Sequence, residues 1–221
     1  MDQVETLKQQ GYVVVPTNQS AQIAIALRAI NGAFYEQGLE PQSQLDFDWT
    51  YFPDLACDPR ILDLSDGATS FLQRILDVPL LPMTGQIALR FPSGDKPFKP
   101  HIDGSYGRTW APHFSALVAV FLSNVGPNDG AMQVWPGSHL RVQNHVADVM
   151  EGRFPPGLLQ GDPTPVVGQA GDVMIAHPLL IHSTSAVKSE HIRYTVFFRV
   201  KVAAQESIGV ELLTNPWLGW L

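Results

Sequence analysis

The sequence predicts a mainly β fold with flanking α-helices, arranged as a double-stranded β-helix, or jelly roll. From about Pro79 onward, short apolar or alternating runs are divided by Pro, Gly, Asn and Asp, a pattern typical of antiparallel β domains. Segments 127–130 and 136–137 supply the residues of tight turns. Residues 193–200 alternate in character, so one face can line a cavity while the other meets helices. The strands predicted on these grounds are 86–91, 114–122, 131–135, 172–177 and 193–202.

The first part of the chain predicts a strand followed by helices. Residues 12–16 form a short apolar run, and Ser20 can cap a helix with apolar residues at helical spacing. Asp58 followed by Pro59 indicates a second helical start, with Gly67 interrupting or joining two helical pieces. We expect residues 1–78 to pack on a β core of residues 79–221 in one domain, because no repeat or low-complexity linker divides the chain.

Composition narrows the function classes. The 221 residues carry a formal charge of -7, which disfavours nucleic acid and anionic membrane surfaces as partners. Cys57 is the only cysteine, so an intrachain disulfide is excluded and a reducing, cytoplasmic location is expected. The polar start does not resemble a secretion signal. The longest apolar run, 116–122, falls short of the roughly 20 residues that span a bilayer. We therefore expect a soluble protein that acts on a small molecule.

A candidate metal site begins at His101-Ile102-Asp103. On an extended segment, residues two apart point to the same side, so His101 and Asp103 can bind one ion. With 7 His and 21 acidic residues, chance gives roughly 0.7 such pairs, and a surface loop pair is the plain alternative. A distant third ligand, for which His182 is the candidate, would complete a two-His, one-carboxylate set. That set leaves coordination positions open for a co-substrate and for oxygen on iron(II).

Three blocks, 100–104, 130–139 and 171–193, resemble the phytanoyl-CoA dioxygenase family of iron(II)/2-oxoglutarate-dependent oxygenases in their letters, order and separation. The resemblance covers about the C-terminal three fifths of the chain. It implies a double-stranded β-helix that uses Fe(II), 2-oxoglutarate and O2. By the same resemblance, iron is bound and catalysis carried by His101, Asp103 and His182, and 2-oxoglutarate is anchored by Arg193.

The chemistry of 2-oxoglutarate supports this assignment, because its distal carboxylate needs a cation. The planar guanidinium of Arg193 suits a carboxylate, and Thr195 faces the same side of the strand. A surface salt bridge is the alternative for Arg193, and Arg90, Lys99 and Arg199 are the next candidates for the anchor. Similarity to the family suggests that Gln86 and Trp135 also contact 2-oxoglutarate, although Trp135 fits core packing at least as well.

Asp103 also bears on the reaction. Related halogenating oxygenases have a small residue at this position, whereas an aspartate fills the coordination site that chloride would need. We therefore expect hydroxylation, with decarboxylation of 2-oxoglutarate to succinate, although desaturation, cyclisation or epoxidation can follow from the same chemistry. The candidate substrate contacts follow Asp103 in the chain and are Tyr106, Arg108 and Trp110. Residues of the N-terminal region can form a lid over the site, and the candidates are Phe47, Trp49 and Tyr51. For both groups, ordinary core or loop packing is the alternative.

Two other histidines are not expected to be metal ligands. We expect His139 to have a structural or hydrogen-bonding role near the site, and His177 to be packed or hydrogen-bonded. The apolar tail of Trp217, Leu218, Trp220 and Leu221 must dock on the protein's own body or on a partner, which leaves monomer and homo-oligomer both open.

Two other functions stay open. One is a cupin-like metalloenzyme that uses zinc, manganese or nickel without 2-oxoglutarate, and the other is a catalytically silent jelly-roll module that binds a ligand. Succinate formation separates both from the oxygenase, while the identity of the substrate stays open in every case.

Overall fold

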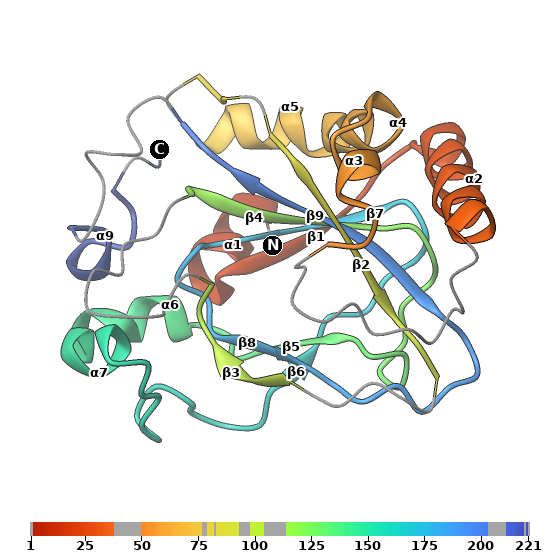
Figure 1. Cartoon of the computed structure of the whole chain (residues 1–221). Coiled ribbons are helices and arrows are strands. Elements are labelled where there is room, and N and C mark those ends of the chain that lie inside the picture. Colours follow the sequence, from red (N-terminus) through yellow and green to blue (C-terminus); the bar gives the residue numbers. More distant parts are fainter. Residues whose placement is uncertain are drawn as a thin grey trace.

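The computed structural model describes residues 2–37, 50–76, 79–81, 83–92, 98–103, 114–202, 211–218 and 220. Two antiparallel sheets lie face to face (Figure 1). The larger has the strand order β1-β7-β4-β9-β2 and the smaller the order β3-β8-β5-β6. This arrangement is the predicted jelly roll. The strands are β1 (Tyr12–Pro16), β2 (Gly85–Arg90), β3 (Phe98–His101), β4 (Ala116–Phe121), β5 (Met132–Val134), β6 (Thr164–Pro165), β7 (Asp172–Ala176), β8 (His182–Thr184) and β9 (Arg193–Val200).

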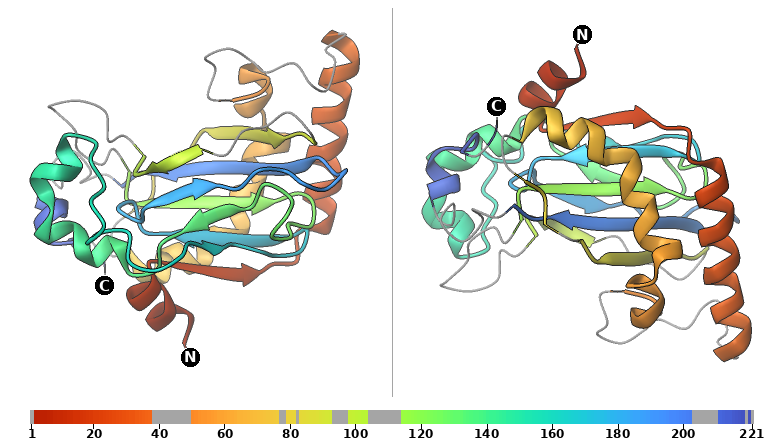
Figure 2. Two further views of the ribbon diagram at one scale, coloured as in Figure 1. Left: turned by 90° about the horizontal axis from the view of Figure 1, so that it is seen from below. Right: turned by 90° about the horizontal axis from the view of Figure 1, so that it is seen from above.

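Helices cover the outer face of the larger sheet and one end of the fold (Figure 2). Helices α2 to α5 lie on the outer face, and α6, α7 and α9 gather at one end. The bounds are α1 (Gln3–Gln10), α2 (Ser20–Gln37), α3 (Pro53–Ala56), α4 (Pro59–Leu62), η1 (Asp63–Ser65), α5 (Asp66–Ile75), α6 (Ser138–Arg141), η2 (Val142–Asn144), α7 (Val146–Met150) and α9 (Glu211–Thr214). No helix among these described segments is long and apolar enough to cross a membrane.

Local signals explain where the helices begin and end. Asp58 caps α4 by accepting a hydrogen bond from the Arg60 amide at 2.9 Å, as its sequence predicts. Helix α1 was not expected, because its residues carry little apolar character, although Asp2 caps its start and Gly11 ends it in the left-handed conformation. The prediction for Gly67 was wrong. It lies inside α5, and η1 forms the joint instead. A Cβ at Gly67 would come within 1.6 Å of the Gln19 side chain, so glycine permits this close approach.

The two faces of the larger sheet form two separate apolar clusters. The outer face packs against the helices and includes Val196 and Phe198 of β9. The inner face lies between the sheets and includes Phe121 of β4, with Phe197 packed against it. The predicted alternation along 193–200 is therefore confirmed. Each fully buried large apolar side chain contributes about 1.5–3 kcal/mol, so the two clusters together fix which face of β9 looks into the interior.

All five predicted strands form, within one or two residues at most ends. The first strand, β1, pairs with β7 at the edge of the larger sheet, so residues 1–78 contribute to the β core as well as to the helices that cover it. Strands β3, β6 and β8 were not predicted as strands. They contain only two to four residues each, which is too short for an alternating pattern to be recognised.

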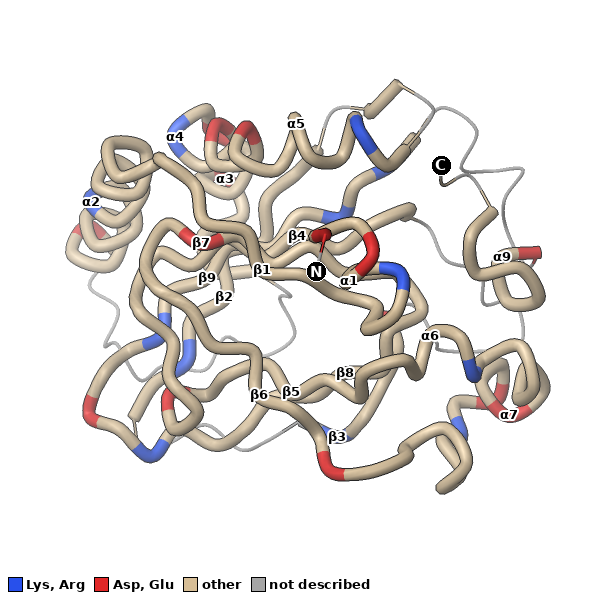
Figure 3. Tube along the Cα trace, turned by 180° about the vertical axis from the view of Figure 1, so that it is seen from behind, with Lys and Arg blue, Asp and Glu red and all other residues tan. Residues whose placement is uncertain are grey.

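The C-terminal tail docks on the protein's own body. Trp220 stacks on His177, with ring centroids 5.3 Å apart, and Trp217 meets His139 edge-on at 5.4 Å. The His177 Nε2–H donates to the Pro216 carbonyl, which ties the ring to the tail. Charged residues of both signs are spread over helices, loops and strands (Figure 3).

Candidate metal centre

Two histidines meet across the smaller sheet. His101 ends β3 and His182 begins β8, and the two residues are directly opposed in the antiparallel ladder. Their ring centroids lie 4.4 Å apart. Directly opposed residues in an antiparallel pair place their side chains on the same face of the sheet. The ladder therefore brings together two imidazoles that are far apart in the sequence.

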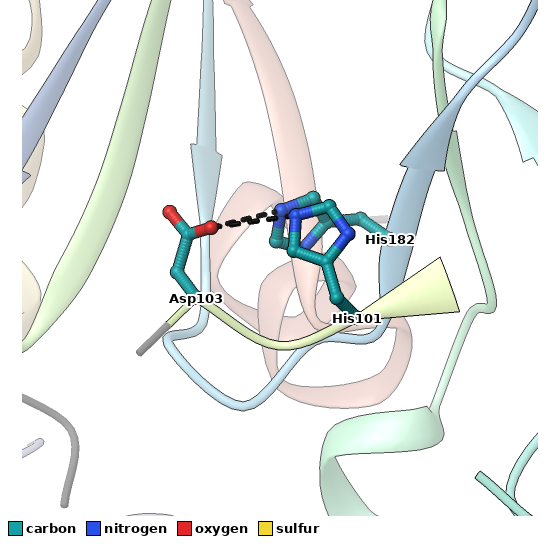
Figure 4. Close-up of side chains that lie close together, drawn as sticks. All are labelled: His101, Asp103 and His182. Atoms are coloured by element: carbon teal, nitrogen blue, oxygen red, sulfur yellow. Dashed lines mark ion pairs between the residues drawn. The ribbon is translucent and has the colours of Figure 1, made fainter. Parts of the chain in front are cut away.

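Asp103 completes the group. Its Oδ1 lies 3.5 Å from the Nε2 of His101 and 3.5 Å from the Nε2 of His182. One donor atom from each residue lies within 4.8 Å of the other two. The three side chains converge at one end of the β3–β8 pair (Figure 4). The structure thus brings together the three residues that the sequence proposed as ligands.

Backbone hydrogen bonds fix the orientation of the two rings and place a proton on each Nδ1. The Nδ1–H of His101 donates to the Lys99 carbonyl, and that of His182 donates to the Leu180 carbonyl, each over 2.9 Å. A neutral ring that donates from Nδ1 presents a lone pair on Nε2. Both Nε2 atoms face Asp103. Backbone carbonyls behind the rings are the usual support for metal-binding histidines.

The second block of the resemblance, 130–139, supports the backbone next to His182. The Trp135 amide donates to the Ile181 carbonyl at 3.1 Å, and the Ile181 amide donates to the Ser138 hydroxyl at 2.9 Å. Ile181 is thereby held on both sides, one residue before His182. Both Ser138 and Ile181 are fully buried. This block therefore acts on the site through the backbone that carries the histidine.

Electrostatics keep Asp103 ionised. Burial opposes its charge, but hydrogen bonds with His101 and His182 and the charge of Arg199 outweigh burial and hold the pKa of Asp103 well below its usual range. For His101, burial is likewise outweighed by its bonds to Asp103 and the Lys99 carbonyl, which raise the pKa of His101. The group is thus prepared to hold a positive charge between the rings and the carboxylate.

Arg199 reaches the same carboxylate from the larger sheet. Its Nε and Nη2 both donate to Asp103 Oδ2, at 3.1 and 2.7 Å, and its Nη1 donates to Gln86 Oε1 at 2.7 Å. Gln86, a predicted 2-oxoglutarate contact, therefore reaches the centre through Arg199. Sequence reasoning ranked Arg199 only as an alternative anchor. The signal that places it on the inner face is its spacing of two, four and six residues from Phe197, Thr195 and Arg193.

Arg193 lies farther along the same inner face. It is 4% exposed, and its Nη1 donates to the Gly130 carbonyl at 2.6 Å. Arg90 is its direct partner in the β2–β9 ladder and is 6% exposed. Opposed residues share a face, so two buried guanidinium groups lie side by side. The planar guanidinium group suits a carboxylate, so both residues are candidates to bind an anionic ligand in the interior.

Thr195 lies on β9 between Arg193 and Arg199. Its hydroxyl is buried and has no hydrogen-bond partner among the described residues. A buried hydroxyl without a partner is costly, which suits a polar ligand in the interior. Trp135 instead packs in the helix-side apolar cluster, which favours the packing alternative for that residue.

The other predicted site residues fall into two groups. Tyr106, Arg108 and Trp110, together with Phe47 and Trp49, lie outside the described residues and stay predictions. Tyr51 packs among other aromatic rings, with centroid distances of 6.0 to 6.2 Å to Phe34, Phe52 and Phe91.

His139 and His177 lie together in the interior and are not among the potential metal ligands. Their rings are 5.0 Å apart, and the His139 Nε2–H donates to the Lys8 carbonyl at 3.1 Å. Burial lowers the pKa of His139 to about 4 and lowers that of His177 well below its usual value. Both rings are therefore neutral structural groups at pH 7.

The donor set fits a non-haem iron(II) ion. Two imidazole nitrogens and one carboxylate oxygen on one side of an ion leave the other side free, which is the arrangement of the oxygenase facial triad. Thiolate ligands, which favour zinc or copper(I), are excluded, since the single cysteine, Cys57, is exposed and outside this group. The residues present thus suit Fe(II) together with a chelating co-substrate.

Solved structures of similar fold include enzymes described as non-haem and α-ketoglutarate-dependent. The carbocyclase SnoK from nogalamycin biosynthesis, described as α-ketoglutarate-dependent, is 23% identical with a TM-score of 0.64, covering 91% of this chain and 83% of its own. HygX from Streptomyces hygroscopicus, with nickel and 2-oxoglutarate bound, is 18% identical with a TM-score of 0.61, covering 91% and 87%. The epimerase SnoN, with Fe3+, α-ketoglutarate and nogalamycin RO, is 18% identical with a TM-score of 0.60, covering 91% and 83%.

At these identities the three structures establish the fold alone. A comparison with curated protein sequences gives no match. The sequence profile of the phytanoyl-CoA dioxygenase family, in contrast, matches residues 7–195, which include strands β1 to β8, the start of β9 and all three potential ligands. The chain therefore belongs to the phytanoyl-CoA dioxygenase family.

Proposed function

We propose that this protein is an iron(II)/2-oxoglutarate-dependent dioxygenase that hydroxylates, or otherwise oxidises, a small organic molecule. The observation that carries the proposal is the convergence of His101 Nε2, His182 Nε2 and Asp103 Oδ1 within 4.8 Å, beside an inner sheet face that carries buried arginines. The three residues would hold Fe(II) and act as the catalytic centre. The whole chain would form one oxygenase domain.

Arg193 is proposed to bind the distal carboxylate of 2-oxoglutarate. It lies on the inner face of β9, as does Arg199, which contacts the metal ligand Asp103. An anion that extends along β9 from the metal centre would pass the Thr195 hydroxyl and reach Arg193 and Arg90. Holding the co-substrate at both ends fixes its orientation at low entropic cost. When bound, iron and 2-oxoglutarate supply the oxidising power, with O2 consumed and succinate and carbon dioxide released.

The buried interior favours a reaction that excludes water. Phe121 and Phe197 flank Thr195 on the inner face, so the space beside the proposed co-substrate is apolar. Low polarity strengthens the contact between a guanidinium and a carboxylate. Tyr106, Arg108 and Trp110 are proposed to contact the substrate, because they follow Asp103 directly in the chain. SnoN was crystallised with the small molecule nogalamycin RO, which supports a small organic substrate here.

Succinate formation tests the proposal. Purified protein is incubated with Fe(II), ascorbate, oxygen and 2-oxoglutarate, and succinate is measured with and without a panel of small organic molecules. The matched comparison is His182→Ala against His191→Ala, since His191 is exposed in a loop. We expect slow succinate formation in wild type and His191→Ala and none in His182→Ala.

The two alternatives give different results. A cupin-like enzyme that needs no 2-oxoglutarate would bind metal but form no succinate under any condition. A silent ligand-binding module would show neither succinate formation nor metal binding that depends on His182. Either result would end the oxygenase proposal.

A further inference from the structure

The two carboxylate oxygens of Asp103 face different partners. Oδ1 faces the two histidines at 3.5 Å each. Oδ2 faces away and accepts both Nε–H of Arg199 at 3.1 Å and Nη2–H at 2.7 Å. The carboxylate is only 10% exposed, so these buried contacts help to set its orientation. Oδ1 therefore faces the two histidines, and Oδ2 is bonded to Arg199.

Arg199 is itself held on two further sides. Its Nη1 donates to Gln86 Oε1 at 2.7 Å, and its guanidinium lies 5.9 Å from the centroid of the Phe114 ring. Gln86 belongs to β2 and Phe114 is 3% exposed just before β4. A planar guanidinium that is fixed by hydrogen bonds and an aromatic face keeps one orientation. Contacts with β2 and Phe114 thus orient Arg199 toward Asp103, which lies two residues after β3.

We propose that Arg199 is a positioning residue that keeps Asp103 a one-oxygen ligand, and this inference rests on the proposed iron site. The count of coordination positions gives the reason. Carboxylates bind metals through one or both oxygens. On a six-coordinate ion, two imidazoles and both carboxylate oxygens, together with a chelating 2-oxoglutarate, would occupy every position. With Oδ2 bonded to Arg199, one position stays open.

The proposal predicts an unusual direction for the change in metal affinity when Arg199 is replaced. Arg199 is a cation beside the proposed cation site, and like charges repel. Removing it also lets Asp103 add a second bond to the metal. Loss of Arg199 should therefore leave metal affinity unchanged or higher. A residue that merely supports the fold would lower metal affinity when it is lost, as removal of outer-sphere partners commonly does by about 10–100-fold.

The test counts exchangeable waters on Mn(II) in the full-length protein, by EPR line broadening in 17O-enriched water without 2-oxoglutarate. Wild type should keep about three waters, since three protein atoms fill half of an octahedral ion. Arg199→Met should keep about one fewer and bind Mn(II) at least as tightly. Arg60→Met is the matched control, because Arg60 is an exposed arginine on α4 paired only with Asp58 in its described contacts. It should behave as wild type.

Arg199→Gln provides the same test should the methionine variant fold poorly, because glutamine is neutral and too short for the two bonds to Oδ2. An unchanged water count in a folded variant would overturn the proposal. Mn(II) affinity weakened as strongly as in His101→Ala would also overturn it, since Arg199 would then act as plain structural support. Failure of wild type to bind Mn(II) would instead refute the proposed metal centre.

Discussion

His101 lies directly opposite His182 across the β3–β8 ladder, and each ring donates its Nδ1–H to the carbonyl two residues earlier, Lys99 and Leu180, over 2.9 Å. The same local hydrogen bond thus occurs on both strands. It turns both Nε2 atoms toward Asp103. Strand pairing and these backbone hydrogen bonds therefore orient the two nitrogen donors.

The first prediction is that each of the three ligands is required for metal binding. His101→Ala, Asp103→Ala and His182→Ala should each weaken Fe(II) or Mn(II) binding by more than about a hundredfold, because each removes a bond to the ion and not only a supporting contact. Anaerobic metal titration by calorimetry measures this. His145→Ala, at a part-exposed histidine beside Asp148, is the control. Unchanged affinity in any of the three variants would remove that residue from the site.

A second prediction concerns acid stability and His139. Its pKa is lowered to about 4 in the folded protein by burial, whereas an unfolded histidine titrates near 6.5. The unfolded chain therefore binds a proton that the folded protein excludes as the pH falls from about 6.5 to about 4. The neutral ring stabilises the fold fully above about pH 6.5, and this contribution is lost through that window. The loss amounts to roughly 3 kcal/mol at the lower end.

Urea unfolding at several pH values between 7 and 4 checks this contribution. His139→Gln, which keeps a donor toward the Lys8 carbonyl, should flatten the dependence of the unfolding free energy on pH by about one proton. His191→Gln, at an exposed histidine, should keep the wild-type slope. Equal slopes in wild type and His139→Gln would show that His139 titrates normally in the folded protein.

A third prediction is that the oxidation does not halogenate. Asp103 Oδ1 points between the two histidines, so the carboxylate occupies the place that a halide ligand would need. Any substrate that stimulates succinate formation should give hydroxylated or desaturated products in buffers that contain chloride or bromide. Mass spectrometry of these products tests the prediction. Products of the wild-type protein that show halogen isotope patterns would contradict it.

Much of the site could be predicted from the sequence, because two kinds of local pattern carry it. The spacing of His101 and Asp103 places both on one side of an extended segment, and the alternation along β9 places Arg193 and Thr195 on one face. The link between His101 and His182 depends on the pairing of β3 with β8. Both strands are too short to show a pattern of their own. The resemblance to a family, and not periodicity, identified His182.

The contact between Arg199 and Asp103 could not be predicted from spacing. Alternation places Arg199 on the inner face, but which residue of the opposite sheet it meets depends on how the two sheets stack. The sequence also left the role of Trp135 open, since a buried aromatic residue can lie on either side of a sheet. Helix α1 was missed because its polar residues carry weak periodicity, although Asp2 and Gly11 mark its two ends.

A fourth prediction concerns the anchor of 2-oxoglutarate. Arg193→Ala should weaken 2-oxoglutarate binding by about ten- to a few hundred-fold, since a charge-assisted contact contributes roughly 1.5–3 kcal/mol and its loss leaves a buried carboxylate without a partner. Metal affinity should change little. Arg193→Lys should recover part of the loss, because lysine keeps the charge but lacks the planar pair of donors. If Arg193→Ala binds 2-oxoglutarate normally, Arg193 is not the anchor, and Arg90, its neighbour across β2–β9, becomes the next candidate.

The most direct test of the central claim is anaerobic calorimetry of 2-oxoglutarate binding to the wild-type protein, with Fe(II) present and with Fe(II) absent. If His101, Asp103 and His182 hold iron while Arg193 holds the far carboxylate, binding should be tight with iron and should weaken strongly without it, because one end of the chelate is then lost. Succinate, which lacks the keto group that chelates iron, should bind weakly in both cases. Failure of wild type to bind 2-oxoglutarate with iron present would contradict the account and favour a cupin-like enzyme that uses no such co-substrate.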